Sequence, residues 1–161
     1  MTVRAENGRQ RRIVVGMDGS VPSKSALSWA VEQGRLTGAV VEAVIAWEFP
    51  ATYGYPIPVS RVDWEQLAQQ AVREAVADAA EAAEGTAPVK VTYKVVEGNA
   101  AQVLLEESAG ADLLVVGNRG YGGFVEALLG STSQHCVHHA GCPVVVIRDA
   151  VTGHAPERGS R

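Results

Sequence analysis

Two short clusters of glycine and hydroxyl residues carry the clearest chemical signal in this sequence. Residues 117–120 read Gly-Asn-Arg-Gly after an apolar run, and residues 130–132 read Gly-Ser-Thr. Glycine lets backbone amides approach a ligand closely, and successive amides can enclose an anion. The second cluster opens a predicted helix, whose first N–H groups and dipole favour negative charge. Together the two clusters predict a binding site for a polyphosphate.

Four side chains near these clusters could contribute to the same site. The hydroxyls of Ser131 and Thr132 can cap the helix or bond a phosphate oxygen, and Arg119 supplies a cation. Asp18 follows the first apolar run of the chain and could hold a divalent ion or a ribose hydroxyl. An aspartate before Gly-Ser can also simply shape a turn, so both interpretations of Asp18 stay open.

Two common nucleotide-binding loops are absent. No Gly-x4-Gly-Lys-Ser/Thr sequence occurs, which excludes a Walker A loop. A dinucleotide fingerprint that starts at Gly120 would need glycine at position 125, where Val125 stands. Gly122 and Gly123 still permit positive φ values, so this loop can direct successive amides into one concavity.

Composition and charge narrow the class of protein. Apolar residues make up 47% of the 161 residues and charged residues 20%, which is typical of a globular chain. The net charge is −4, but the basic residues gather near the ends, so positions 13–147 carry seven basic and fifteen acidic residues. So acidic a body is a poor partner for nucleic acid.

No apolar run approaches the ~20 residues that span a bilayer, and the first residues do not resemble a secretory signal. We expect a cytoplasmic protein whose two cysteines are thiols.

Short apolar runs alternate with helical patterns along the chain, which predicts an α/β fold with a parallel sheet and helices on both faces. Strands are expected at 12–16, 40–47, 89–96, 112–116 and 143–147. Ligands of such sheets bind beyond the carboxyl ends of the strands. Both Asp18 and the 117–120 cluster stand at such ends.

Capping residues predict where the helices begin and end. Ser20 caps a first helix that Gly34 and Gly38 bracket at its end, and Asn99 caps a later helix that Gly110 closes. Between them, a long helix runs from a capping box at residues 60–63 to residue 84. The fourth helix is expected at 131–140, and the prolines of 49–59 predict a loop.

The pattern Gly-x2-Gly-x9-Gly-Ser from residue 117 resembles the ATP-binding signature of universal stress proteins. The sequences IVVGMDGS at 13–20 and STSQHCVHHAGCPVVVIR at 131–148 strengthen this resemblance. It covers residues 11–148 as one nucleotide-binding domain, with 1–10 and 149–161 expected as flexible tails. It implies a Rossmann-like, open five-stranded parallel sheet of order 3-2-1-4-5, with ATP and accompanying Mg²⁺ between the ends of strands one and four.

The resemblance also assigns roles by position. Gly16 and Asp18 would lie near the base, ribose or metal, with Asp18 as the candidate metal ligand. The end of the second strand, Ala46-Trp47, would lie near the adenine. The cofactor-binding residues that it implies are Gly16, Asp18, Trp47, Gly117, Asn118, Arg119, Gly120, Gly122, Gly123, Gly130, Ser131 and Thr132.

The function that the resemblance implies is an ATP-binding, nucleotide-dependent stress-response or regulatory homodimer with unknown protein partners. The apolar edge strand at 143–147 would pair with its copy across a two-fold axis. Three alternatives remain open. The first is a slow ATP-hydrolysing enzyme, and the second is a dimeric interaction module that needs no nucleotide. The third is a metal or redox site built from His135, Cys136, His138, His139 and Cys142.

Overall fold

The computed structural model describes residues 9–48, 61–82, 87–119 and 129–148. Strands and helices alternate throughout these residues, as the sequence predicts. The elements are β1 (Arg12–Met17), α1 (Val21–Thr37), β2 (Val40–Trp47), α2 (Arg61–Ala82), β3 (Val91–Glu97), α3 (Ala100–Glu107), β4 (Leu113–Gly117), α4 (Ser131–His139) and β5 (Val144–Ile147). The predicted tails, except residues 9 and 10, and the predicted loop 49–59 lie outside the described residues. None of the helices described here has both the length and the apolar character that crossing a bilayer requires.

The strands form one parallel sheet of order β3-β2-β1-β4-β5. The predicted α/β fold class and strand order are therefore confirmed. β1 is the central strand, where Val15 lies between Ala43 of β2 and Val115 of β4. Because all strands run the same way, their carboxyl ends meet at one edge of the sheet.

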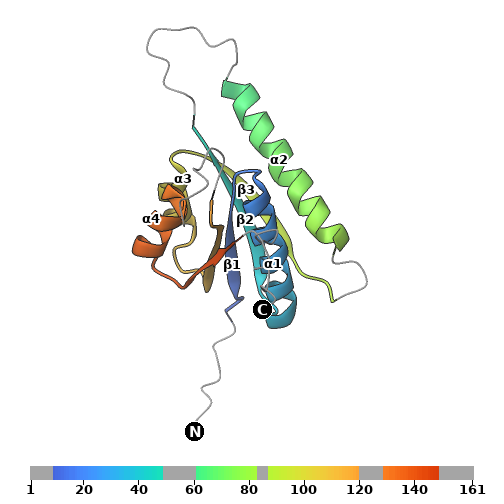
Figure 1. The fold of residues 1–161 in the computed structure, drawn as a ribbon. Coiled ribbons are helices and arrows are strands. Elements are labelled where there is room, and N and C mark those ends of the chain that lie inside the picture. Colours follow the sequence, from blue (N-terminus) through green and yellow to red (C-terminus); the bar gives the residue numbers. More distant parts are fainter. Residues whose placement is uncertain (1–8, 49–60, 83–86, 120–128, 149–161) are drawn as a thin grey trace, which may run out of the picture.

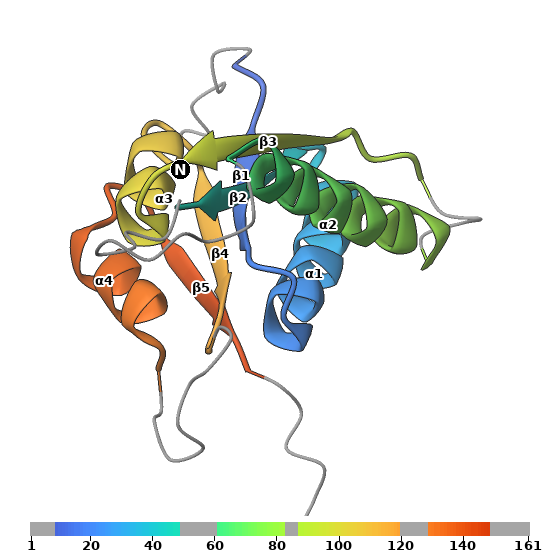
Figure 2. The ribbon, with the colours of Figure 1, turned by 90° about the horizontal axis from the view of Figure 1, so that it is seen from above.

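Helices cover both faces of the sheet, α1 and α2 on one side and α3 and α4 on the other (Figures 1 and 2). Side chains of β1 alternate between the two resulting cores, since successive residues of a strand point to opposite faces. Val15 packs under α1 and α2, and Val14 packs under α3 and α4, both fully buried. Burial on both faces explains why the predicted first strand is an almost continuous apolar run rather than an alternating one.

α1 begins as predicted, and it ends within the predicted bracket of Gly34 and Gly38. The Ser20 hydroxyl accepts a hydrogen bond from the Ser23 amide, and Gly38 adopts the left-handed conformation that terminates the helix, with φ 73°. Gly34 does not mark the end, because it lies inside the helix. A Cβ at Gly34 would lie 2.8 Å from the side chains of both Val41 and Val89, so glycine there lets the helix approach the sheet closely.

Other predicted boundaries shift by one to three residues. β1, β3 and β4 each extend one residue further than predicted at their carboxyl ends. Asn99 caps α3 as expected, but this helix ends at Glu107 with Ser108 as its C-cap, and Gly110, with φ 69°, forms the turn that follows.

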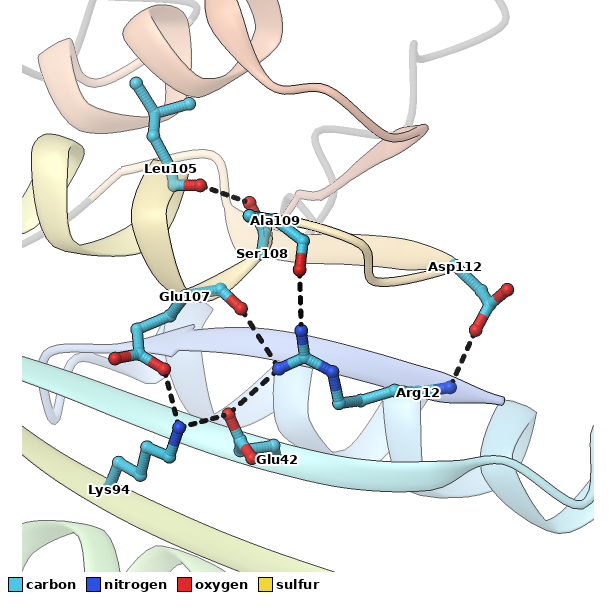
Figure 3. Close-up of polar contacts among 8 residues, drawn as sticks. All are labelled: Arg12, Glu42, Lys94, Leu105, Glu107, Ser108, Ala109 and Asp112. Carbon is cyan, nitrogen blue, oxygen red and sulfur yellow. Dashed lines mark hydrogen bonds and ion pairs between the residues drawn. The ribbon is translucent and has the colours of Figure 1, made fainter. Parts of the chain in front are cut away.

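At the amino ends of the strands, Arg12 joins three parts of the fold (Figure 3). Its guanidinium donates to the Glu42 carboxylate of β2 and to the carbonyl oxygens of Glu107 and Ala109, at 3.0–3.2 Å. Lys94 of β3 donates to Glu107 at 2.7 Å and lies 3.4 Å from Glu42. This network therefore ties β1, β2 and β3 to the end of α3.

Asp112 holds the start of β4 against the same strand. Its carboxylate accepts the backbone N–H of Arg12 at 2.8 Å and pairs with the Arg9 guanidinium at 2.9 Å. The Arg12 amide is the main cause that holds the pKa of Asp112 below its usual range, and the Arg9 hydrogen bond adds to it. Residues 9 and 10 therefore contact the domain, since Gln10 also donates to the Gly38 carbonyl at 3.0 Å.

Candidate functional site

A cavity of about 380 Å³ lies at the carboxyl ends of β1 and β4. Strand ends form its floor, and the first turns of α1, α3 and α4 form its walls. This is the edge of the sheet at which the sequence predicts a ligand. The lining residues are Gly16, Met17, Asp18, Ser23, Val44, Ala46, Ala100, Leu104, Val116, Gly117, Arg119, Gly130, Ser131, Thr132 and Ser133.

The structure brings most of the predicted site residues together here. Of the twelve predicted residues, those that line the cavity are Gly16, Asp18, Gly117, Arg119, Gly130, Ser131 and Thr132. Trp47 and Asn118 are not among the lining residues. Gly120, Gly122 and Gly123 lie outside the described residues, so the structure shows nothing of their place.

Trp47 lies on the opposite face of the sheet from the cavity. It packs against the core under α1 and α2, whereas its neighbour Ala46 packs on the α3 and α4 side and lines the cavity with Val44. Strand alternation alone predicts this difference. The apolar wall of the cavity is therefore made by small β2 side chains together with Leu104 of α3.

Asp18 forms the tight turn between β1 and α1. Its Oδ1 accepts hydrogen bonds from the backbone N–H of Ser20 at 2.9 Å and from the Ser20 hydroxyl. Gly19 completes the turn with φ 80°. The turn-shaping interpretation thus holds, and the exposed carboxylate also lines the cavity. The structure confirms the turn, and the role of Asp18 toward a metal or a ribose hydroxyl stays a prediction.

The first turn of α4 faces the cavity without a side-chain cap. Gly130 occupies the N-cap position with an extended backbone and no side-chain hydrogen bond, so Ser131 and Thr132 are not capping residues. The Ser133 hydroxyl donates to the Gly117 carbonyl at 2.5 Å, which fixes this turn against β4. Four N–H groups at a helix start lack intrahelical partners, and here they adjoin a cavity that Arg119 also lines. The arrangement suits an anion.

Gly16 and Gly117 are needed for different reasons. A Cβ at Gly117 would lie 2.7 Å from Pro22 Cβ and 2.9 Å from the Pro22 carbonyl carbon, so packing of α1 requires glycine there. We predicted instead that Gly117 gives a ligand room, and its closest constraint is this helix contact. A Cβ at Gly16 would lie 2.7 Å from Leu104 Cδ1, on the cavity side.

Asn118 joins β4 to β5 and α4. Its amide donates to the Ile147 carbonyl at 2.8 Å, and its carbonyl accepts the Gly130 amide at 2.6 Å. The side chain is buried, and its Oδ1 has no hydrogen-bond partner among the residues that the structure describes. The Gly130 contact brings the two ends of the 119–129 segment together at the cavity.

Several lining residues escaped sequence reasoning. Ser23 and Ser133 resemble ordinary helix residues in the sequence, and only the packing of α1 and α4 brings them to the cavity. Ala100 and Leu104 belong to the first turns of α3, which lies over the carboxyl ends of the strands. The general rule that helices of a parallel sheet begin at this edge could have identified them.

The histidines and cysteines near α4 form no metal site. His135 and His139 are exposed, with ring centroids 4.5 Å apart. Cys136 is buried in the core under α4, and burial raises the pKa of its thiol. Within the described part of the chain, no three His, Cys, Asp or Glu side chains group closely enough to hold a metal. The metal alternative therefore has no support from the described residues.

Solved structures share this fold. Universal stress protein UspA from Lactobacillus plantarum superposes with a TM-score of 0.70 at 22% identity, covering 88% of this chain and all of that one. A universal stress protein solved in complex with cAMP has 29% identity and a TM-score of 0.62, covering 85% of this chain and 95% of that chain.

Sequence comparison agrees with these structures. A universal stress protein of Mycobacterium tuberculosis is 34% identical over 163 residues, which cover 92% of this chain and 53% of that protein. The chain thus spans about half the length of the curated relatives it matches. The model of the universal stress protein family matches residues 10–148, which include every strand and helix described above. The chain therefore belongs to the universal stress protein family.

Proposed function

We propose that the cavity binds an adenine nucleotide, ATP with Mg²⁺, and that binding regulates a homodimer. The observation that carries the proposal is the uncapped first turn of α4, which adjoins a cavity of about 380 Å³ that Arg119 also lines. The structure with cAMP, from a relative of 29% identity, supports adenine-nucleotide binding in such a fold.

One end of the cavity is apolar and the other is polar, as the base and the phosphates of a nucleotide require. Val44, Ala46 and Leu104 offer an apolar wall for the base, whereas Ser131 and Arg119 stand where phosphates would accept hydrogen bonds. Charge-assisted hydrogen bonds from guanidinium and helix amides to phosphate are stronger than neutral ones. This polarity orients the base toward β2 and the phosphates toward α4.

Asp18 fits the metal that accompanies ATP. Mg²⁺ in nucleotide sites is held by one or two carboxylates together with phosphate oxygens and water. The exposed Asp18 carboxylate lines the cavity, and its turn with Ser20 holds it in place. When bound, the metal would offset the repulsion between this carboxylate and the phosphates.

Binding is favoured over rapid catalysis. Asp18 is the one carboxylate among the described lining residues, and its Oδ1 already accepts two hydrogen bonds. Phosphoryl transfer also needs a group that positions the nucleophile. Slow hydrolysis remains the second candidate, and release of ADP during a long incubation with MgATP measures it.

The homodimer is proposed from β5, the last strand of the described sheet. All four of its residues are partly exposed although they are valine or isoleucine. Pairing with the β5 of a second copy would cover this edge. A cytoplasmic location is part of the same proposal, and it rests on Cys136 and Cys142, which are free thiols.

Titration calorimetry with MgATP tests the nucleotide proposal. Wild-type protein should show saturable binding, and Arg119→Gln should weaken it about tenfold because one charged hydrogen-bond donor to phosphate is lost. Arg35→Gln is the matched control, since Arg35 lies at the far end of α1 and pairs with Glu32. Absence of saturable binding of ATP, ADP, AMP and cAMP to the wild type would refute the proposal.

A further inference from the structure

A second cavity of about 400 Å³ lies beside the first, between α3 and α4. Its described lining residues all come from α3, α4 and the residue before α3, whereas residues of β1, β2 and β4 line the first cavity. Its lining residues include Asn99, Gln102 and Leu105 from the α3 side and Ser131, Thr132 and His135 from α4. The proposed function makes no use of this cavity.

The two cavities share a wall. Ser131 and Thr132 line both, and neighbouring residues of α3 divide between them, with Ala100 in the first cavity and Ala101 in the second. The first turn of α4 is therefore exposed to both spaces. A phosphate held by the amides of this turn would lie at the boundary between the two cavities.

The second cavity offers groups that suit phosphate. Its described lining residues carry two amides, two hydroxyls and an imidazole but no carboxylate, although the Gln102 amide donates to the neighbouring Glu106 carboxylate at 3.1 Å. Residues four apart on a helix share a face, which places His135 beyond Ser131 along the lining of this cavity. His135 is exposed. An imidazole can donate a hydrogen bond when neutral and two when protonated.

We propose that the second cavity receives the terminal phosphates of a nucleoside triphosphate, with His135 as the residue that contacts the last one. The inference rests on the proposed function and specifies its ligand further. The phosphate chain passes from the first cavity over Ser131 and Thr132 and ends beside His135. A monophosphate or a cyclic monophosphate is too short to reach this position, so His135 selects for triphosphates.

The dissociation constants of ATP and AMP, measured by calorimetry, test the role of His135. In wild-type protein ATP should bind more tightly than AMP. His135→Ala should weaken ATP binding about fivefold, as expected for loss of one hydrogen bond, and should leave AMP binding unchanged. His138→Ala is the matched control, since His138 is an exposed histidine of the same helix that does not line the cavity.

A second variant and two further outcomes make the test decisive. His135→Lys keeps an N–H donor at this position and should retain the preference for ATP. If His135→Ala changes the dissociation constants of ATP and AMP by the same factor, or changes neither, the role of His135 is overturned. Nucleotide binding itself would remain intact. If the wild type binds neither nucleotide, the proposed function fails, and this inference fails with it.

Discussion

At the scale of single residues, three glycines border the cavity and each meets a different neighbour. Gly117 faces the backbone of Pro22, Gly16 faces the tip of Leu104, and Gly130 occupies the N-cap of α4. A backbone atom cannot move aside for a new methyl group, whereas the end of a leucine side chain can. The same substitution at these positions should therefore have different effects on stability and on binding.

Gly16→Ala should weaken nucleotide binding more than it weakens the fold. The new Cβ would displace Leu104 Cδ1, which lies 2.7 Å away and lines the cavity. We expect about tenfold weaker ATP binding and a loss of about 1 kcal/mol in unfolding free energy, because the leucine can rotate. Calorimetry and urea denaturation measure the two effects.

Gly141→Ala is the control for this prediction, because a Cβ there would meet nothing within 4 Å. It should change neither quantity. Gly117→Ala, with its backbone contact at 2.9 Å, should instead destabilise the fold by about 2–3 kcal/mol. Equal stability losses in Gly16→Ala and Gly117→Ala would contradict this explanation of the two glycines.

At this scale the sequence predicts which residues belong to the site better than it predicts where their side chains point. Asp18, Arg119 and Ser131 could be predicted because they stand in clusters whose spacing has a chemical use. The position of Trp47 could not be predicted from the resemblance alone, since a single step along β2 changes the face of the sheet. The need for Gly117 depends on how closely α1 approaches β4, which no local pattern encodes.

At the scale of elements, α4 begins without a cap where most helices have one. Ser20 and Asn99 cap α1 and α3 through their side chains, but Gly130 offers none to α4. A helix start without a side-chain cap is less stable in the unliganded protein. The absence of a cap becomes favourable if a phosphate supplies the missing acceptors.

Gly130→Asp should abolish ATP binding while the fold stays equally stable or becomes slightly more stable. Gly130 has φ −69° and ψ 160°, an extended conformation that an aspartate cap also adopts. The new carboxylate would accept the amides of the first turn and repel phosphate. We expect unfolding free energy to stay equal or rise by about 0.5 kcal/mol, while ATP binding is lost. Gly130→Ala, which supplies no acceptor, should keep measurable binding, and tight ATP binding by Gly130→Asp would contradict the assignment of the phosphate site.

At the opposite edge of the sheet, Asp112 should make stability depend on pH. Its pKa is lowered in the folded protein, mainly by the Arg12 amide, so its charge stabilises the fold above the pKa of the unfolded chain. This contribution is lost as pH falls through the lowered folded pKa. The side chain is 39% exposed, which screens the effect and limits it to about 1 kcal/mol or less.

Asp112→Asn tests this prediction because asparagine can still accept the Arg12 amide. Urea denaturation at pH 7 should show the variant less stable than the wild type. The difference should shrink as pH falls below about 4, where the ordinary aspartate titrates. A difference that stays constant down to pH 2.5 would mean that lost packing, and not lost charge, causes it.

At the scale of the whole molecule, β5 combines an apolar sequence with an open edge. Leu114 donates to the Pro143 carbonyl and Asn118 to the Ile147 carbonyl. In a parallel ladder alternate residues bond to the same neighbour. Val144 and Val146 therefore direct their backbone groups away from β4, toward the proposed second copy.

Val146→Pro should separate the homodimer without removing a bond between β4 and β5. Proline removes an N–H that faces the open edge, a position where edge strands tolerate it. Light scattering after size exclusion should show a dimer for wild type and a monomer for the variant, with helical content retained by circular dichroism. A wild type that is monomeric at micromolar concentration would refute the dimer.

The fold was the most predictable level, because β1, β2, β4 and β5 are largely apolar and β3 partly alternates, and helical patterns separate them. Alternation of strands and helices then leaves few topologies. The end of α3 was less predictable than that of α1, since Ser108 ends α3 without a glycine, whereas Gly38 ends α1 as the sequence predicts. Helix ends depend on local hydrogen bonds that many sequences can satisfy.

The walls of the first cavity come from residues as far apart as Gly16 and Ser133. During synthesis the ribosome therefore releases nearly all of the strands and helices described here before the last wall exists. A ligand can bind only after that point, so it cannot protect a growing chain from proteases or chaperones. Any stabilisation by nucleotide then acts on the finished domain alone. The abundance of the protein in the cell would therefore depend both on complete folding and on the supply of nucleotide.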